Sequence, residues 1–149
     1  MHAVEAILPV WKKLLRWDPA GDDMLLIKPA RAGESMQRTA LFTEVRFEQD
    51  EDGDETRVFR APGDRQAMIE CWLTFVESTL QERVPLDIAD PEQGTRTQDM
   101  FPKGLSQMEF ESKWRTLDEP LWREWWACVL EVNPQWDDFG AGRAKVSKA

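Results

Sequence analysis

The chain has 149 residues, of which 42% are hydrophobic and 32% are charged, and its formal net charge is −9. This size and balance predict one globular domain with one hydrophobic core rather than a disordered chain. The acidic balance argues against direct binding to nucleic acid or to anionic membrane surfaces, and no apolar run is long enough to span a bilayer.

The N-terminal residues combine a helical pattern with an early proline. Apolar residues from Val4 to Leu15 recur at helical spacing, which predicts a helix that begins near residues 6–8 and ends before the stretch "WDPAGDD". The lysines at 12–13 follow the apolar residues instead of preceding them, unlike in a secretory signal. We therefore expect a soluble, cytoplasmic protein.

Two short segments follow. The apolar run "MLLIKP" at 24–29 predicts a strand, and "ARAGES" at 30–35 predicts a loop. Apolar and polar residues then alternate on both sides of an acidic stretch, which predicts a β-hairpin over residues 39–61 with Gly53 in its turn. The acidic residues of the predicted tip are Asp50, Glu51, Asp52, Asp54 and Glu55.

The acidic tip does not match a calcium loop. If Gly53 takes the sixth position of an EF-hand loop, Phe59 takes the twelfth, where the motif requires a bidentate glutamate. We therefore predict no metal site, with loose divalent-cation binding as a weak alternative. The tip is interpreted either as a solvated turn or as a docking loop that complements lysine and arginine on a partner.

Helical patterns dominate the second half of the chain. A stripe of apolar residues predicts a helix from Asp64 to about Arg83, and the polar stretch 85–104 predicts a long surface loop of a kind that is often functional. Ser106 and Glu109 have the spacing of a capping box, which predicts the start of a short helix. A last helix is predicted from Asp118 to the sequence "NPQW" at 133–136.

Tryptophan and cysteine lie mostly inside these helical stretches. Trp122, Trp125 and Trp126 share one face of the last predicted helix, where they either fill the core or form a partly exposed aromatic platform. Cys71 and Cys128 are expected to be buried and reduced. Together the elements predict an α+β fold, in which a small antiparallel sheet built on the hairpin packs against several helices. Residues 1–139 would form the single domain, and residues 140–149 a flexible tail.

The negative charge is concentrated in one part of the chain. Residues 1–49 hold seven acids and seven bases and are neutral, whereas residues 50–149 hold 21 acids and 12 bases and carry the whole excess. This asymmetry suggests a non-enzymatic protein that binds a basic protein partner, of the inhibitor, immunity-protein or nucleic-acid-mimic type. The expected contacts are the tip residues 50–55 and the acids of the 87–99 loop, with Trp136 beside Asp137 and Asp138 as an anchor.

Two alternatives remain open. The first is a small enzyme that uses carboxylates in a tryptophan-lined pocket on a sugar or an organic cation. The second is a structural or adaptor subunit of a larger assembly. The only histidine is His2, near the start of the chain, which argues against a histidine-dependent catalytic site, and no pattern indicates a cofactor. The sequence does not determine the oligomeric state.

Overall fold

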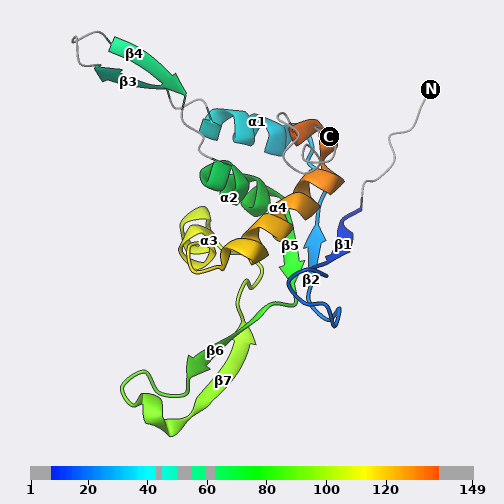
Figure 1. Ribbon diagram of the computed structural model, residues 1–149, viewed down its shortest axis with the longest axis vertical. Coiled ribbons are helices and arrows are strands. Elements are labelled where there is room, and N and C mark those ends of the chain that lie inside the picture. The colour runs from blue at the N-terminus through cyan, green and yellow to red at the C-terminus, as the bar shows by residue number, and fades with distance from the viewer. Residues whose placement is uncertain (1–7, 43–44, 50–54, 60–62, 138–149) are drawn as a thin grey trace.

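The protein has an α+β fold in which helices pack on one face of a small antiparallel sheet (Figure 1). The computed structural model describes residues 8–42, 45–49, 55–59 and 63–137. The helices are α1 (Ala32–Phe42), α2 (Gly63–Thr74), α3 (Gln107–Trp114) and α4 (Glu119–Val132), with the 3₁₀ turns η1 (Pro91–Gln93) and η2 (Pro134–Trp136). The strands are β1 (Val10–Lys13), β2 (Met24–Ile27), β3 (Val45–Gln49), β4 (Glu55–Phe59), β5 (Phe75–Ser78), β6 (Gln81–Pro85) and β7 (Thr95–Asp99).

The sheet that carries the core has three strands in the order β1-β2-β5. In β2, Leu25 and Ile27 are buried, whereas Met24 and Leu26, which alternate with them, stay partly exposed. This alternation follows from the pleat, which turns successive side chains to opposite faces. One face of the sheet is therefore built into the core, and the other is only partly covered.

The core is aromatic, and the tryptophans of the last helix contribute to it. The ring of Trp125 is fully buried and lies edge-on to Phe101, Phe110 and Trp114, with centroid distances of 4.9, 5.7 and 5.3 Å. Trp122 and Trp126 pack at the margin of the same cluster. Edge-on pairs at these distances are favourable in addition to their burial. Of the two interpretations of this helix face, core packing is confirmed for Trp125.

Side chains of helix α4 and of Asn133 directly after it accept hydrogen bonds from the backbone of the N-terminal segments. The Glu124 carboxylate accepts hydrogen bonds from the backbone N–H groups of Arg16 and Trp17, at 2.9 and 2.7 Å. The buried Asn133 Oδ1 accepts one from the N–H of Ala30 at 2.6 Å. Residues more than 100 positions apart in the chain are thus joined.

The predicted N-terminal helix is wrong where the structure describes it, because residues 10–13 form strand β1. Trp11 pairs with Leu26 across the β1–β2 hairpin, and the N–H of Leu14 bonds to the carbonyl of Asp23 at 3.0 Å. The apolar pattern over so few residues fits either period, and pairing with β2 decides between them. Residues 1–7 lie outside the described part.

The segment 30–42 also differs from the prediction. A loop followed by the start of a strand was expected, but residues 32–42 form helix α1. The Glu34 carboxylate accepts the N–H of Arg31 at 3.2 Å in the first turn, and Leu41 packs against the core. The predicted hairpin is confirmed over β3 and β4, which pair from Val45 opposite Phe59 to Gln49 opposite Glu55. These two strands form a separate sheet, so they are not the sheet on which the helices pack.

Helix α2 ends nine residues earlier than the stripe predicts. It stops at Thr74, whose hydroxyl donates to the carbonyl of Glu70 at 2.7 Å. Phe75 then begins strand β5, where pairing with Ile27 of β2 places its ring 5.9 Å from that of Trp125. The predicted long loop is likewise wrong in part, because most of it belongs to the hairpin β6–β7 and the turn η1.

The last two helices agree with their predicted boundaries. Ser106 caps α3 with both hydrogen bonds of the capping box in place, and Asn133 ends α4 directly before Pro134. Cys71 and Cys128 are free and buried, as expected. Within the described ranges, no helix is long and apolar enough to cross a bilayer. The predicted tail 140–149 falls outside these ranges.

Candidate functional site

The antiparallel strands β6 and β7 form an arm that projects from the body of the protein (Figure 1). Their register runs from Gln81 opposite Asp99 to Pro85 opposite Thr95, and the N–H of Leu86 bonds to the carbonyl of Gly94 at 3.0 Å. Figure 1 shows the arm extending away from the helices and the main sheet. None of its residues from 81 to 99 is buried. The arm is thus a ribbon with two uncovered faces.

The base of the arm is fixed to the body by a charged contact. Glu82 Oε1 accepts hydrogen bonds from Gln98 Nε2 at 2.8 Å and from Lys113 Nζ of helix α3 at 2.9 Å. These two contacts lower the pKa of the Glu82 carboxyl. Phe101, two residues after the end of β7, is inserted into the aromatic core. The arm therefore leaves the body from an anchored base.

The tip of the arm, residues 86–94, is held by its own hydrogen bonds. Asp87 Oδ1 accepts the N–H of Ala89 at 2.9 Å, and the N–H of Gln93 bonds to the carbonyl of Asp90 at 3.1 Å. Gly94 has a φ of +108°, a conformation that favours glycine, and it returns the chain to β7. The tip thus has a defined conformation although nothing covers it.

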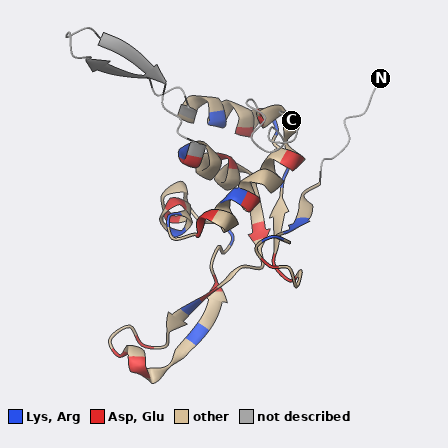
Figure 2. Ribbon diagram, viewed as in Figure 1, with Lys and Arg blue, Asp and Glu red and all other residues tan. Residues whose placement is uncertain are grey.

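The tip combines acidic and apolar side chains. Ile88 is 90% exposed and Leu86 is 57% exposed. Asp87, Asp90 and Glu92 are exposed as well, and no base occurs between residues 86 and 94. Figure 2 shows these acids at the end of the arm. Single exposed apolar residues are common on proteins, but two of them beside three acids on a projecting tip form a surface suited to binding.

Charges on the helices are arranged differently. Arg123 pairs with Glu119 at 2.7 Å, and Arg115 pairs with Glu111 at 2.8 Å, each within one helix turn. Lys12 joins β1 to α4 through Glu131 at 3.0 Å. The three tip acids take part in none of the ion pairs among the described residues. The helical surface therefore mixes both signs, whereas residues 86–94 of the tip carry acids alone. The bases of the arm, Arg83 and Arg96, lie in its strands.

Most of the residues predicted as partner contacts cannot be placed. Asp50, Glu51, Asp52, Asp54 and Asp138 lie outside the described residues. Glu55 begins β4 opposite Gln49. Whether the tip of this hairpin binds a partner stays a prediction.

Trp136, predicted as an exposed anchor, is instead buried. Its side chain is 2% exposed, its Nε1 donates to Ser35 Oγ at 3.3 Å, and the Arg38 guanidinium lies 5.2 Å from its ring centroid. Asp137, the next residue, is partly exposed. The expected exposure of Trp136 is wrong because η2 turns the ring inward against helix α1. The sequence shows only that Trp136 follows the end of a helix, and this position does not indicate whether the ring points into the core or into solvent.

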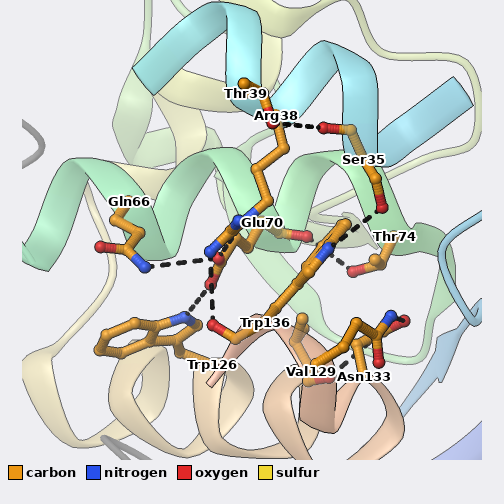
Figure 3. Close-up of polar contacts among 11 residues, drawn as sticks. Ser35, Arg38, Thr39, Gln66, Glu70, Thr74, Trp126, Val129, Asn133 and Trp136 are labelled. Carbon is orange, nitrogen blue, oxygen red and sulfur yellow. Dashed lines mark hydrogen bonds and ion pairs between the residues drawn. The ribbon is translucent and has the colours of Figure 1, made fainter. Parts of the chain in front are cut away.

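A buried polar cluster joins α1, α2, α4 and η2 (Figure 3). The side chain of Glu70 has no exposed surface, and its carboxylate accepts hydrogen bonds from Arg38 Nε and Trp126 Nε1, each at 2.6 Å. Gln66 Nε2 adds a contact of 3.4 Å, and an Arg38 Nη donates to the carbonyl of Trp136 at 3.3 Å. Burial raises the pKa of Glu70, and its hydrogen bonds act in the opposite direction.

This cluster has the chemistry of a structural ion pair rather than of a substrate site. The single carboxylate is enclosed, and neighbouring side chains satisfy both of its oxygens. The alternative of an enzyme requires at least two carboxylates that converge in an open pocket. A depression of about 400 Å³ is lined by Trp114 and by two carboxylates, Asp64 and Glu111. Arg65 and Arg115 pair with Glu111, Asp64 accepts a hydrogen bond from the backbone N–H of Arg65 at 2.8 Å, and the Trp114 ring is buried. Over the described ranges, no group of three metal-binding side chains occurs.

Comparison with known proteins adds no assignment. No family model, no curated protein and no solved structure matches this chain significantly. The candidate site therefore rests on the chain's own geometry. Sequence reasoning identified the acids of the 87–99 stretch but missed the apolar residues among them. The signal was present as Leu86 and Ile88 within an otherwise polar run, "PLDIADPEQG".

Proposed function

We propose that this protein is a small acidic binding protein that engages a basic protein partner through the tip of the β6–β7 arm. One observation carries the proposal: a ribbon with both faces uncovered ends in Leu86 and Ile88, surrounded by three acids. A two-stranded hairpin on its own is marginally stable in water. Burial of the tip on the surface of a partner would therefore stabilise the arm.

The two kinds of side chain at the tip have separate roles in this proposal. The acids attract a basic surface over a distance of about one Debye length, roughly 8 Å at physiological salt, and thereby speed the encounter. Ile88 and Leu86 then lose their exposure to water, which supplies about 25 cal/mol for each Å² of apolar surface buried. The charges determine mainly the association rate, and the apolar side chains determine mainly the lifetime of the complex.

Inhibitors of nucleases, immunity proteins and nucleic-acid mimics all present acidic surfaces to basic partners, and the proposal places this protein in that group. In this proposal the protein acts in the cytoplasm, where both cysteines stay reduced. An adaptor role in a larger assembly uses the same arm. The mass of the captured complex distinguishes one dedicated partner from an assembly with many subunits.

The test is affinity capture from the native cell with quantitative mass spectrometry. The tip variant D87N/D90N/E92Q removes three charges while its amide oxygens keep the acceptors of the turn. The control variant D64N/D118N/E119Q removes three exposed acids from the helical surface. We expect a basic protein that the wild type and the control capture equally and that the tip variant captures at least about fivefold less. Equal capture by the tip variant would contradict the proposal.

A further inference from the structure

Exposed large apolar side chains concentrate in two segments of the described chain. One is the arm tip with Leu86 and Ile88. The other is the stretch 8–17, which comprises β1 and the turn after it. Met36 and Met108 are exposed singly on α1 and α3. The exposed apolar residues of the stretch 8–17 are Leu8, Val10, Trp11, Leu15 and Trp17.

The second segment continues onto the uncovered face of the main sheet. The register of β1 and β2 places Trp11 beside Leu26 and Lys13 beside Met24 on the face opposite the helices. Trp11 is 44% exposed, and Met24 and Leu26 are partly exposed. We call these four residues, together with Leu15 and Arg16 of the following turn, the β1 strip.

The β1 strip and the arm tip have opposite charges. Residues 8–17 contain Lys12, Lys13 and Arg16 and no acid, whereas residues 86–94 contain three acids and no base. Lys12 is paired with Glu131 of helix α4. Lys13 and Arg16 are exposed and take part in none of the ion pairs found among the described residues. On the neighbouring strand β5, Glu77 lies opposite Leu26 and is paired with Lys103 at 3.0 Å. Lys13 and Arg16 are thus the charges of the strip that the tip acids would neutralise.

We propose that the arm tip of one copy docks on the β1 strip of a second copy. Ile88 and Leu86 of the tip would cover Trp11 and Leu26, while the tip acids face Lys13 and Arg16. A second copy is the occupant that the chain itself indicates, because every copy carries both complementary surfaces. When each arm binds the other copy's strip, the two contacts are identical and the assembly closes as a twofold dimer.

This inference rests on the arm tip as a binding surface, as the proposed function does, but it names a different occupant. A basic partner and a second copy then compete for the same tip. The apolar anchors matter here, because two copies with a net charge of −9 each repel one another at long range. Local complementarity between tip and strip has to outweigh that repulsion.

Sedimentation velocity of the purified full chain tests the dimer between about 1 µM and about 1 mM, the range of weak to moderate affinities. We expect a concentration-dependent dimer in the wild type. The variant Ile88→Ser should weaken association at least tenfold, because it removes the most exposed apolar side chain of the tip. Met36→Ser, at a position 73% exposed on helix α1, is the matched control and should dimerise like the wild type.

Charge reversal gives the sharper test. The strip variant K13E/R16E has two acidic surfaces, and the tip variant D90K/E92K has two basic ones, so each should be monomeric alone. Mixed in equal amounts, the two variants should form a heterodimer, because each tip then meets a strip of opposite charge. A wild type that stays monomeric throughout would overturn the inference. So would a dimer that Ile88→Ser leaves intact, or a mixture of the two reversal variants that fails to associate.

The outcomes separate this inference from the proposed function. A monomeric wild type whose tip still captures a basic partner removes the dimer and keeps the proposed function. If the wild type forms a dimer that the variants weaken, and the tip variant captures the same proteins as the wild type, the dimer is kept and the proposed function is removed.

Discussion

Glu70 lies in an unusual environment for a carboxylate. Its side chain has no exposed surface, yet it bears a carboxylate that three neighbouring side chains contact. Removing charges from water is costly, so a buried ion pair is weak evidence for stability, but breaking one by removing a single partner is strongly destabilising. The importance of Glu70 lies in holding α1, α2, α4 and η2 in one arrangement.

The substitution Arg38→Met should lower the free energy of unfolding by about 3–5 kcal/mol at neutral pH, because it leaves the Glu70 carboxylate buried without its cation. Adding Glu70→Gln should restore most of this loss, since the amide oxygen still accepts the Trp126 Nε1–H and no charge remains. Urea unfolding followed by circular dichroism measures both values. A double variant as unstable as Arg38→Met would show that packing by the arginine, rather than charge, is decisive.

The same residue predicts a pH dependence. Because the pKa of Glu70 is raised in the folded state, the native protein holds this proton more tightly than the unfolded chain does. The resulting stability is fully present below the ordinary pKa of 4.5 and is lost as the pH rises through the raised value. The free energy of unfolding of the wild type should therefore fall relative to that of Glu70→Gln as the pH rises from below 4.5 through the raised folded-state pKa. A constant difference would show that the folded-state pKa is not raised.

At the scale of elements, the sequence predicted some boundaries well and others poorly, for physical reasons. Capping at Ser106 and the stop at Pro134 depend on local hydrogen bonds and dihedral restrictions, which neighbouring residues alone determine. The segments 10–13 and 75–78 became strands because they pair with β2, a tertiary contact that a helical stripe does not reveal. The arm was partly missed because polar residues on both faces of a ribbon give no alternation between apolar and polar side chains.

The arm should be separable from the rest of the fold. Replacing residues 84–96 with Asn-Gly joins Arg83 to Thr97, which already face each other across the ribbon, through a turn suited to a hairpin. Because the removed residues bury no side chain, the free energy of unfolding should change by less than about 1 kcal/mol. Urea unfolding measures this change. A large loss would mean that the arm supports the body, and partner capture would then have to be tested with point variants alone.

At the scale of the whole molecule, the excess of acid is only partly a directional surface. On the helices, bases are interspersed with acids and pair with them, whereas the arm tip carries acids alone. The candidate site could be predicted from the sequence as far as its charge, because acids are seldom buried without partners. Its apolar anchors, Leu86 and Ile88, could not be predicted, since their exposure depends on how the arm projects from the body. For the same reason the sequence did not predict that Trp136 is buried.

The second acidic hairpin allows a test of long-range attraction. Neutralising Asp50, Glu51, Asp52, Asp54 and Glu55 together should slow association with the captured basic partner and flatten the salt dependence of its rate. Stopped-flow or surface-binding kinetics at several salt concentrations measure this rate. The dissociation rate serves as the internal control and should stay nearly constant. An unchanged association rate would remove this hairpin from the approach path and leave the β6–β7 arm as the attracting element.

The hydrogen bonds from Glu124 and Asn133 back to residues 16, 17 and 30 have a consequence for synthesis. Strand β5, which pairs with β2, follows it by some fifty residues in the chain, and helix α4, which covers both strands, follows later still. During translation, the first hundred residues therefore emerge from the ribosome without the helix that closes their core. Nascent chains of this protein should remain open to chaperones and proteases until residue 133 has cleared the exit tunnel, and should then fold in one late step.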